Sequence, residues 1–158
     1  MSLEDEAKML QNIELFSHLD PSKLKLLAFT SHWLEFQPGE ELFHQGEPGD
    51  SAYIVTRGTV EILAETDAGP VLVATRGENQ VIGEMAILCD TPRTATIRAR
   101  DNVCTLHVSK DVFLQLVKGS PEIAVEIIRT LANRLEETTA KLSDAKEKLT
   151  AAGLDAPG

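Results

Sequence analysis

The sequence predicts a mainly β fold with flanking helices, within one domain over residues 1–150. Six short β-rich segments lie between residues 35 and 108, and turn signals separate them. Helical patterns occur before and after this region, and strands and helices do not alternate within it. Short strands at regular spacing favour a sandwich, barrel or roll, whereas a doubly wound parallel sheet would need strands and helices to alternate.

Residues 4–34 are expected to form the N-terminal helices. Asp20-Pro21 is a typical start signal, because aspartate can cap a helix and proline fits its first turn. The apolar positions that follow are Leu24, Leu26, Leu27 and Phe29.

The strand region is expected over residues 35–108. Its segments are rich in residues that favour strands. They are residues 41–44, 52–55, 59–63, 70–74, 94–98 and 103–108. Turn signals lie between them, at residues 38–39, 46–50, 57–58, 67–69 and 100–102.

Helices are expected again over residues 109–150. Ser109 can cap the first of them, and Ser120-Pro121 is a start signal for the second. The second carries a seven-residue repeat in which Thr138 is the polar member. Its positions are Ala124, Ile128, Leu131, Leu135, Thr138, Leu142, Ala145 and Leu149. Residues 151–158 have the composition of a flexible tail.

Charge and composition argue against several function classes. The net charge of −10 disfavours general binding to nucleic acid or to anionic membranes, because both require phosphate charges to be neutralised. No apolar run is long enough for a membrane span, and the N-terminus does not resemble a signal peptide. Cys89 and Cys104 form no spacing motif, as expected for reduced thiols in a cytoplasmic protein.

One segment, residues 82–96, combines the groups needed to hold a small phosphate. Gly83 allows a tight turn, and the next residues can begin a helix whose first N–H groups are free to bind an anion. Arg93 offers a planar fork, Thr94 a hydroxyl, and Glu84 a carboxylate for a sugar hydroxyl. Taken singly, Glu84 is an ordinary helix cap and Arg93 its surface partner, but their order within one segment favours a binding site.

This segment resembles the phosphate-binding cassette of the cyclic nucleotide-binding domain family. Gly83-Glu84-Met85-Ala86 followed by Pro92-Arg93-Thr94-Ala95 is similar to the family signature. The resemblance covers most of the chain and implies an eight-stranded β-roll between N-terminal helices and two C-terminal helices. The family usually has a turn glycine where Asn79 stands here, and asparagine tolerates the left-handed conformation.

The resemblance also implies a role for each cassette residue. The cyclic phosphate would contact Arg93, Thr94 and Ala86, the ribose would contact Gly83 and Glu84, and packing support would come from Ile82, Met85 and Ala95.

The base contact is predicted on the final helix. In the bacterial catabolite activator protein, a member of this family, a Thr-Ser pair there touches adenine, and the interval of 45 residues from Arg93 to Thr138 matches. Thr138, Thr139 and Arg134 are therefore candidate base contacts, with cyclic AMP as the favoured ligand. Cyclic GMP is the other possible ligand. In the family, a threonine directly after the cassette arginine, the position of Thr94, is associated with cyclic GMP. The alternative is that Thr138 and Thr139 are merely small residues on a helix surface.

The seven-residue repeat predicts a homodimer through the C-terminal helix. Ile128 and Leu131 at core positions suit a two-stranded parallel coiled coil. Lys141 and Lys146 argue against it, because they would face each other across the pair and repel. A single helix that packs on its own β-roll, with Ile127 on the buried side, is the alternative.

These observations predict a reversible cyclic nucleotide sensor in which ligand moves the C-terminal helix. No catalytic constellation is present, so neither enzyme activity nor a cofactor is expected. A metal is not expected, because cupin-type spacing is missing from the histidines, which are His18, His32, His44 and His107. This chain alone is not expected to bind nucleic acid, because it stops too soon for a helix-turn-helix. The alternatives are a ligand-sensing fragment of a transcription regulator, channel or transporter, and a dimerisation module with a degenerate pocket.

Overall fold

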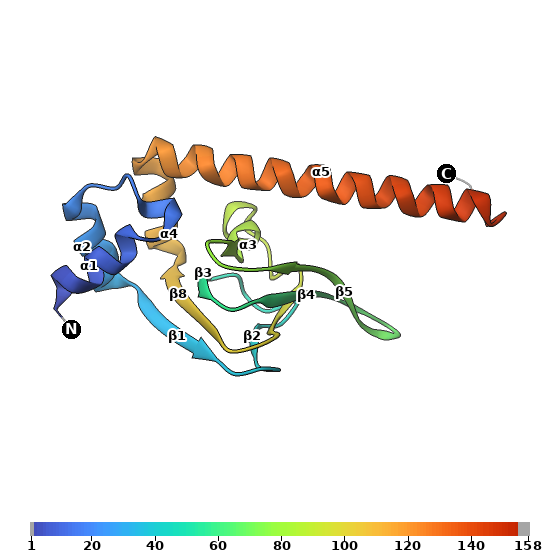
Figure 1. Cartoon of the computed structure of the whole chain (residues 1–158), viewed down its shortest axis with the longest axis horizontal. Coiled ribbons are helices and arrows are strands. Elements are labelled where there is room, and N and C mark those ends of the chain that lie inside the picture. Colours follow the sequence, from blue (N-terminus) through green and yellow to red (C-terminus); the bar gives the residue numbers. More distant parts are fainter. Residues whose placement is uncertain (1, 155–158) are drawn as a thin grey trace. The chain divides into compact units, whose positions relative to one another are not determined.

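The computed structural model describes residues 2–154, which divide into two compact units between Ser120 and Pro121 (Figure 1). The first unit contains the N-terminal helices, all the described strands and two further helices. The second contains the long C-terminal helix. No helix among the described residues has both the length and the apolar character that a bilayer crossing requires.

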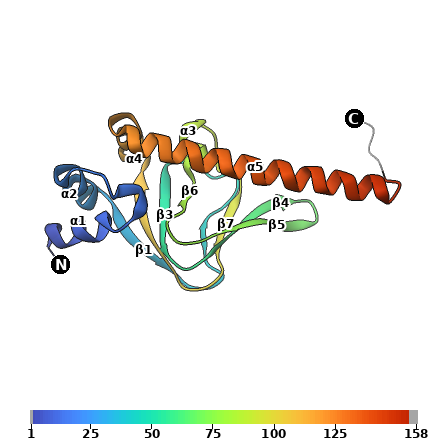
Figure 2. The same ribbon diagram turned by 45° about the horizontal axis from the view of Figure 1, so that its top comes forward.

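The N-terminal region is helical, as expected. It consists of α1 (Leu3–Gln11), the 3₁₀-helix η1 (Glu14–Phe16) and α2 (Pro21–Thr30). Figure 2 shows α1 and α2 side by side. Leu10, Phe16 and Leu27 are almost fully buried, so burial rather than helix length stabilises these short elements. Asp20 occupies the predicted N-cap position of α2, but among residues 2–154 its side chain makes no capping hydrogen bond.

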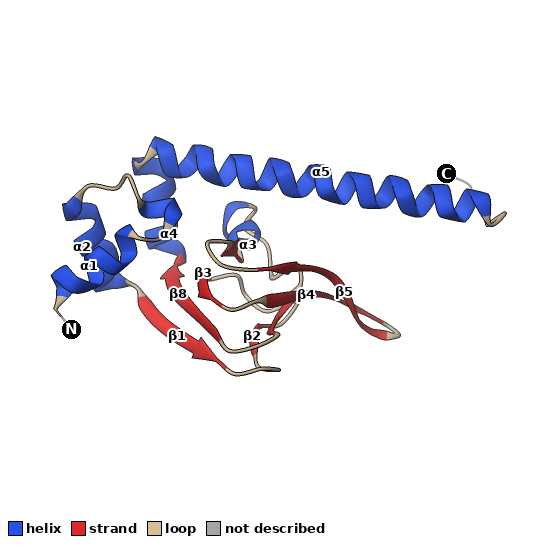
Figure 3. Cartoon of the chain, in the orientation of Figure 1, coloured by secondary structure: helices blue, strands red, loops and turns tan. Residues whose placement is uncertain are grey.

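Eight strands form two four-stranded antiparallel sheets, which confirms the expected β-roll (Figure 3). They are β1 (His32–Phe36), β2 (Glu41–Phe43), β3 (Ser51–Arg57), β4 (Val60–Thr66), β5 (Gly69–Arg76), β6 (Val81–Ile82), β7 (Thr96–Ala99) and β8 (Val103–Ser109). The strand orders are β1-β8-β3-β6 and β2-β7-β4-β5. Because β1 pairs with β8 and β2 with β7, hydrogen bonds join the two ends of the strand region.

The strand region differs from the sequence-based expectation most clearly at β1, β6 and β7. Residues 32–34, expected in the helical region, belong to β1, because they pair with residues 105–107 of β8 along the sheet. β6 has only two residues, too few for a recognisable pattern. β7 begins at Thr96, because Arg93 is held in a loop by the hydrogen bond from Gly46 N–H to its carbonyl oxygen.

An apolar core fills the roll. Its buried members come from both sheets, and Phe36 and Ile62 pack against it while partly buried. The cluster comprises Leu42, Phe43, Tyr53, Val55, Val60, Ile82, Ile97, Ala99 and Val103. Three members connect this core to the cassette. Ile82 belongs to the cassette and pairs with Tyr53, and the Phe43 ring lies against the Arg93 guanidinium.

Two helices end the chain. The first is α4 (Lys110–Gly119), where the Ser109 hydroxyl accepts from Val112 N–H at 3.4 Å, as predicted. The second, α5 (Pro121–Ala151), starts at the predicted proline. Large members of its seven-residue repeat are exposed: Ile128 by 64%, Leu135 by 67%, Leu142 by 57% and Leu149 by 43%. Within the expected tail, Ala151 still belongs to α5, and residues 155–158 lie outside the described residues.

Candidate functional site

The predicted cassette follows β6 and contains the short helix α3 (Glu84–Leu88). Gly83 is the N-cap of α3 and adopts a left-handed conformation with φ of 86°. A Cβ atom there would lie 2.6 Å from Arg93 Nη1 and 3.2 Å from the Ser51 carbonyl oxygen. Glycine is therefore required both by the backbone conformation and by the close approach of the arginine.

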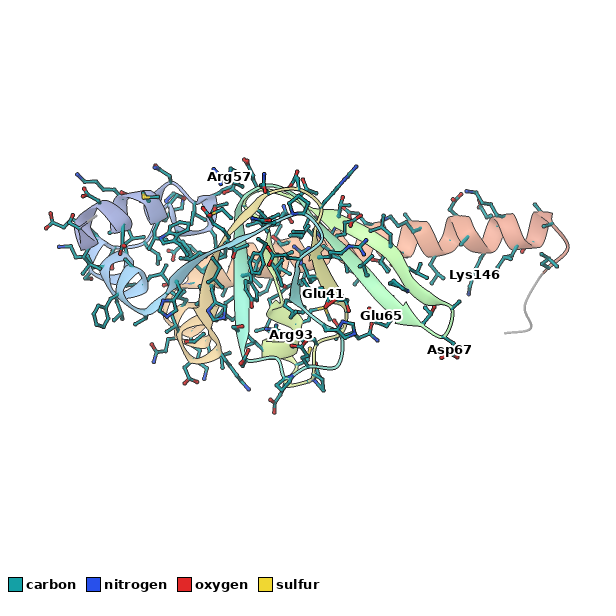
Figure 4. The ribbon with its side chains drawn as sticks, turned by 90° about the horizontal axis from the view of Figure 1, so that it is seen from below. Glu41, Arg57, Glu65, Asp67, Arg93 and Lys146 are labelled. Atoms are coloured by element: carbon teal, nitrogen blue, oxygen red, sulfur yellow. The ribbon has the colours of Figure 1, made fainter. Side chains whose placement is uncertain are left out.

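The Arg93 side chain is turned into the molecule and is only 2% exposed. Nη1 donates to the Gly83 carbonyl oxygen at 3.2 Å, and Nη2 donates to Ser51 Oγ at 3.1 Å. The guanidinium carbon lies 4.0 Å from the centre of the Phe43 ring, a cation–π contact. In Figure 4, Arg93 is seen beside the yellow-green helix α3. The arginine is thus oriented by three different elements of the roll.

The buried positive charge of Arg93 is poorly compensated. Its nearest acidic partner, Asp50, has Oδ1 3.7 Å from Nη2 and is itself 82% exposed. Nε is buried and has no hydrogen-bond partner among the described residues. Burial lowers the pKa of Arg93, while Tyr53 and the carboxylates of Asp50 and Glu47 act in the opposite direction. A buried cation with weak compensation is a favourable position for an anion.

The loop that precedes β3 fixes the backbone of the same arginine. Arg93 N–H donates to the Glu47 carbonyl oxygen at 2.8 Å, and Gly46 N–H donates to the Arg93 carbonyl oxygen at 2.9 Å. Gly49 packs so closely on α3 that a Cβ atom there would collide with the Ala86 Cβ. The loop of residues 46–50 and the cassette therefore form one packed assembly.

The other predicted cassette residues differ in their burial. Ile82, Glu84 and Ala86 are buried, at 2%, 4% and 3% exposure. Ala95 is half-buried and Thr94 is exposed. Met85 is 47% exposed, so only part of its side chain is able to pack in the cassette. On a helix of 3.6 residues per turn, Met85 lies on the opposite side from the buried Glu84, Ala86 and Ile87.

The predicted base-contact residues lie on α5, in the second compact unit, and are described there alone. Thr138 and Thr139 are exposed, and Arg134 is half-buried. The Thr138 hydroxyl donates to the Arg134 carbonyl oxygen at 2.9 Å, one turn earlier. The geometry thus unites the phosphate and ribose candidates within the first unit only.

Sequence reasoning did not include Phe43, Asp50 and Ser51 among the site residues. Asp50 belongs to a segment that was interpreted as a turn, and Ser51 begins the next strand. Ser51 is 42 residues from Arg93 in the chain, so their contact depends on the fold. The available signal was a polar pair, Asp50-Ser51, directly before the apolar run Ala52-Tyr53-Ile54-Val55.

A second polar cluster surrounds His44, just after β2. Nδ1 lies 3.2 Å from both carboxylate oxygens of Glu41, and Nε2 lies 3.8 Å from Glu65 Oε1. Glu41 and Glu65 are seen near one another in Figure 4. The hydrogen bond to Glu41 raises the pKa of His44. Within residues 2–154, no three histidine, cysteine or acidic side chains are arranged to hold a metal ion.

A separate hollow of about 820 Å³ lies at the turns that join other strands. None of its lining residues belongs to the cassette. They are Glu35, Phe36, Gln37, Glu40, Arg57, Gly58, Asp101, Asn102 and Val103.

The β-roll and its cassette define a regulatory type of ligand-sensing domain. The chain belongs to the cyclic nucleotide-binding domain family, whose model matches residues 33–120. It is 29% identical over 138 residues to the CRP-like cAMP-activated global transcriptional regulator of Mycobacterium tuberculosis. That match covers 87% of this chain and 62% of the regulator, so the chain spans less than two thirds of this relative.

Two solved structures extend the comparison. The cAMP-binding acyltransferase from Mycobacterium smegmatis superimposes with a TM-score of 0.75 and 29% identity, over 85% of this chain and 42% of that protein. The regulatory subunit of a cAMP-independent protein kinase A from Trypanosoma brucei gives a TM-score of 0.72 at 24% identity, over 89% and 51% of the two chains. The second likeness supports the fold alone.

Proposed function

We propose that this chain binds a cyclic nucleotide reversibly and acts as a sensor module. The buried, weakly compensated guanidinium of Arg93 carries this proposal. A cyclic phosphodiester is a monoanion whose two free oxygens suit a guanidinium fork. Arg93 would bind these oxygens, together with the Thr94 hydroxyl and the backbone N–H of Ala86, at the start of α3.

Glu84 and Gly83 would hold the ribose. Glu84 is buried beside Gly83 at the start of α3, and an ionised carboxylate is a strong acceptor for the 2′-hydroxyl. This contact would select ribose over deoxyribose ligands. Ile82 and Ala95 would support the cassette by packing.

Cyclic AMP is the favoured ligand, and cyclic GMP is the second candidate. The similarity to a cAMP-activated regulator and to a cAMP-binding acyltransferase supports cyclic AMP. Cyclic GMP remains a candidate because the exposed Thr94 hydroxyl could accept a hydrogen bond from the guanine amine. Thr138, Thr139 and Arg134 are the proposed base contacts.

We further propose that residues 1–150 work as one module in which ligand moves the C-terminal helix. A ligand can do this only if it binds the two helix positions with different affinity. The exposed apolar repeat of α5 supports a homodimer through that helix, since an apolar stripe at this spacing suits a second helix. No catalysis by this domain is proposed. The two cysteines are unpaired, which supports a cytoplasmic location.

A binding experiment tests the ligand proposal. Isothermal titration should give a saturable signal with cyclic AMP or cyclic GMP, and none with 5′-AMP. Arg93→Ala should weaken binding by about 2–4 kcal/mol, a loss of about 30- to 1000-fold, because the phosphate loses its charge partner. Arg57→Ala, at an arginine that is 67% exposed, is the matched control and should keep the wild-type affinity.

The same titration distinguishes the alternatives. A chain that binds neither cyclic nucleotide would be a dimerisation module with a degenerate pocket. A chain that binds one of them, within a longer gene product, would be the sensing part of a transcription regulator, channel or transporter. Wild-type affinity in the Arg93→Ala variant would exclude the cassette as the binding site.

A further inference from the structure

A half-buried histidine, His107, lies in a row of aromatic side chains across one sheet. It sits on β8 between two strands, opposite His32 of β1 and Tyr53 of β3. The imidazole stacks on His32 with ring centres 6.4 Å apart, and it meets the Tyr53 ring edge-on at 5.0 Å. Two aromatic rings therefore cover part of its surface, and the rest is partly exposed.

The same row of rings continues to the cassette arginine. The Tyr53 and Phe43 ring centres are 5.8 Å apart, and Phe43 carries the Arg93 guanidinium 4.0 Å above its centre. Only two aromatic side chains thus intervene between the His107 ring and the buried positive charge. Tyr53 and Phe43 are buried, so the space between the imidazole and the guanidinium is filled largely by protein, and screening there is weaker than in bulk water.

The charged groups that face His107 come from each neighbouring element. Asp50, ahead of β3, favours the protonated imidazole, whereas His32 of β1 and Arg93, ahead of β7, disfavour it. Burial is the largest influence, and it lowers the pKa of His107. In α4, which follows β8, the Lys110 ammonium is paired with Asp90 at 3.1 Å.

We propose that His107 is a proton-binding site coupled to the phosphate site at Arg93, so that the module takes up a proton when it binds its ligand. The inference rests on the proposed function, because it requires an anion at Arg93. In the free protein, the Arg93 charge repels an imidazolium at His107. A bound phosphodiester offsets that charge and makes protonation easier.

Thermodynamic linkage fixes the direction of the effect. If ligand makes His107 easier to protonate, protonation of His107 must strengthen ligand binding by the same factor. The ligand phosphodiester itself stays monoanionic throughout the neutral range. Affinity should therefore rise as pH falls through the titration of His107, by about three- to tenfold for two charges separated by a partly screened packed region.

His44 provides the matched control. Its pKa is raised by Glu41, Glu65 and Glu47, and Arg93 is not among the charges that act on it. His44→Gln should therefore keep the pH dependence of ligand binding, whereas His107→Gln should remove it.

The experiment measures the dissociation constants of cyclic AMP and cyclic GMP by titration calorimetry from about pH 5.5 to pH 8 at constant ionic strength. Wild type and His44→Gln should bind about three- to tenfold more tightly at the acidic end, and His107→Gln should show a flat profile. A flat wild-type profile, or a wild-type slope in His107→Gln, would overturn the inference while leaving the proposed function intact. Absence of binding at every pH would refute both.

A second measurement keeps the inference testable if His107→Gln does not fold. The four histidines of the wild-type chain can be followed by NMR during a pH titration, with and without cyclic nucleotide. The His107 resonance should titrate at higher pH in the bound state, and the His44 resonance should titrate at the same pH in both states. An unchanged His107 titration in the bound state would overturn the coupling.

Discussion

Replacing Gly83 with alanine separates two reasons for a glycine in the cassette. Gly83 has φ of +86° and Gly39 has φ of +88°, so alanine meets nearly the same left-handed strain at both positions. That strain costs about 1–2 kcal/mol. At Gly39, a Cβ atom would have none of the described atoms within 4 Å, and at Gly83 it would lie 2.6 Å from Arg93 Nη1. The pair therefore isolates the close approach of the arginine.

The extra cost at Gly83 follows from that distance. Ordinary contact requires about 3.5 Å, so the guanidinium must move by about 1 Å. Such a shift strains its bonds to the Gly83 carbonyl and to Ser51 and its contact with Phe43. We expect Gly83→Ala to lose about 1–3 kcal/mol of unfolding free energy beyond Gly39→Ala, and to bind cyclic nucleotide at least about tenfold more weakly.

Urea unfolding and titration calorimetry of both variants measure these two quantities. Gly39→Ala should keep the wild-type affinity and lose only the stability that left-handed strain explains. If both variants have the same unfolding free energy and the same affinity, the Arg93 side chain is not held against Gly83 before ligand binds.

The remaining predictions concern His44, Phe43 and α5. Glu41 raises the folded-state pKa of His44, so the stabilising effect of His44 is present at acidic pH and is lost as pH rises through that pKa. In urea unfolding, the stability advantage of wild type over His44→Gln should be larger at about pH 5.5 than at about pH 8.5. Phe43→Leu removes the ring beneath Arg93 and should weaken binding about two- to thirtyfold in the same calorimetric assay. Leu135→Glu adds a charge to the exposed repeat and should turn a dimer into a monomer by light scattering; an unchanged dimer mass would exclude this helix as the interface.

The sequence was most informative where the pattern is local. Ser109 caps α4, Pro121 opens α5, and the turn at Gly83 is followed by a helix, all as predicted. Each of these features depends on residues within a few positions of each other. Turn glycines and helix caps are short-range devices, so they can be recognised without knowing the fold.

Prediction failed where distant segments decide the structure. β1 is a strand because β8 lies beside it, and residues 32–34 are too few to show an alternating pattern of their own. Ser51 joins the site because Arg93 reaches it across the roll. The close contact between Ala86 of α3 and Gly49 likewise joins two segments that are far apart in the sequence. Contacts between segments that are far apart in the sequence form only in the folded chain, and they override the local sequence pattern.

The loop of residues 46–50 holds the main chain of Arg93 at two points, and Ser51 holds its side chain. The arginine is consequently rigid before any ligand arrives, so little conformational entropy remains to be lost on binding. Association can then approach the rate of diffusional encounter, and differences in affinity among ligands should lie in how slowly they leave. A module of this kind would respond quickly when the ligand concentration rises. When the concentration falls, its response would be limited by the rate at which bound ligand dissociates.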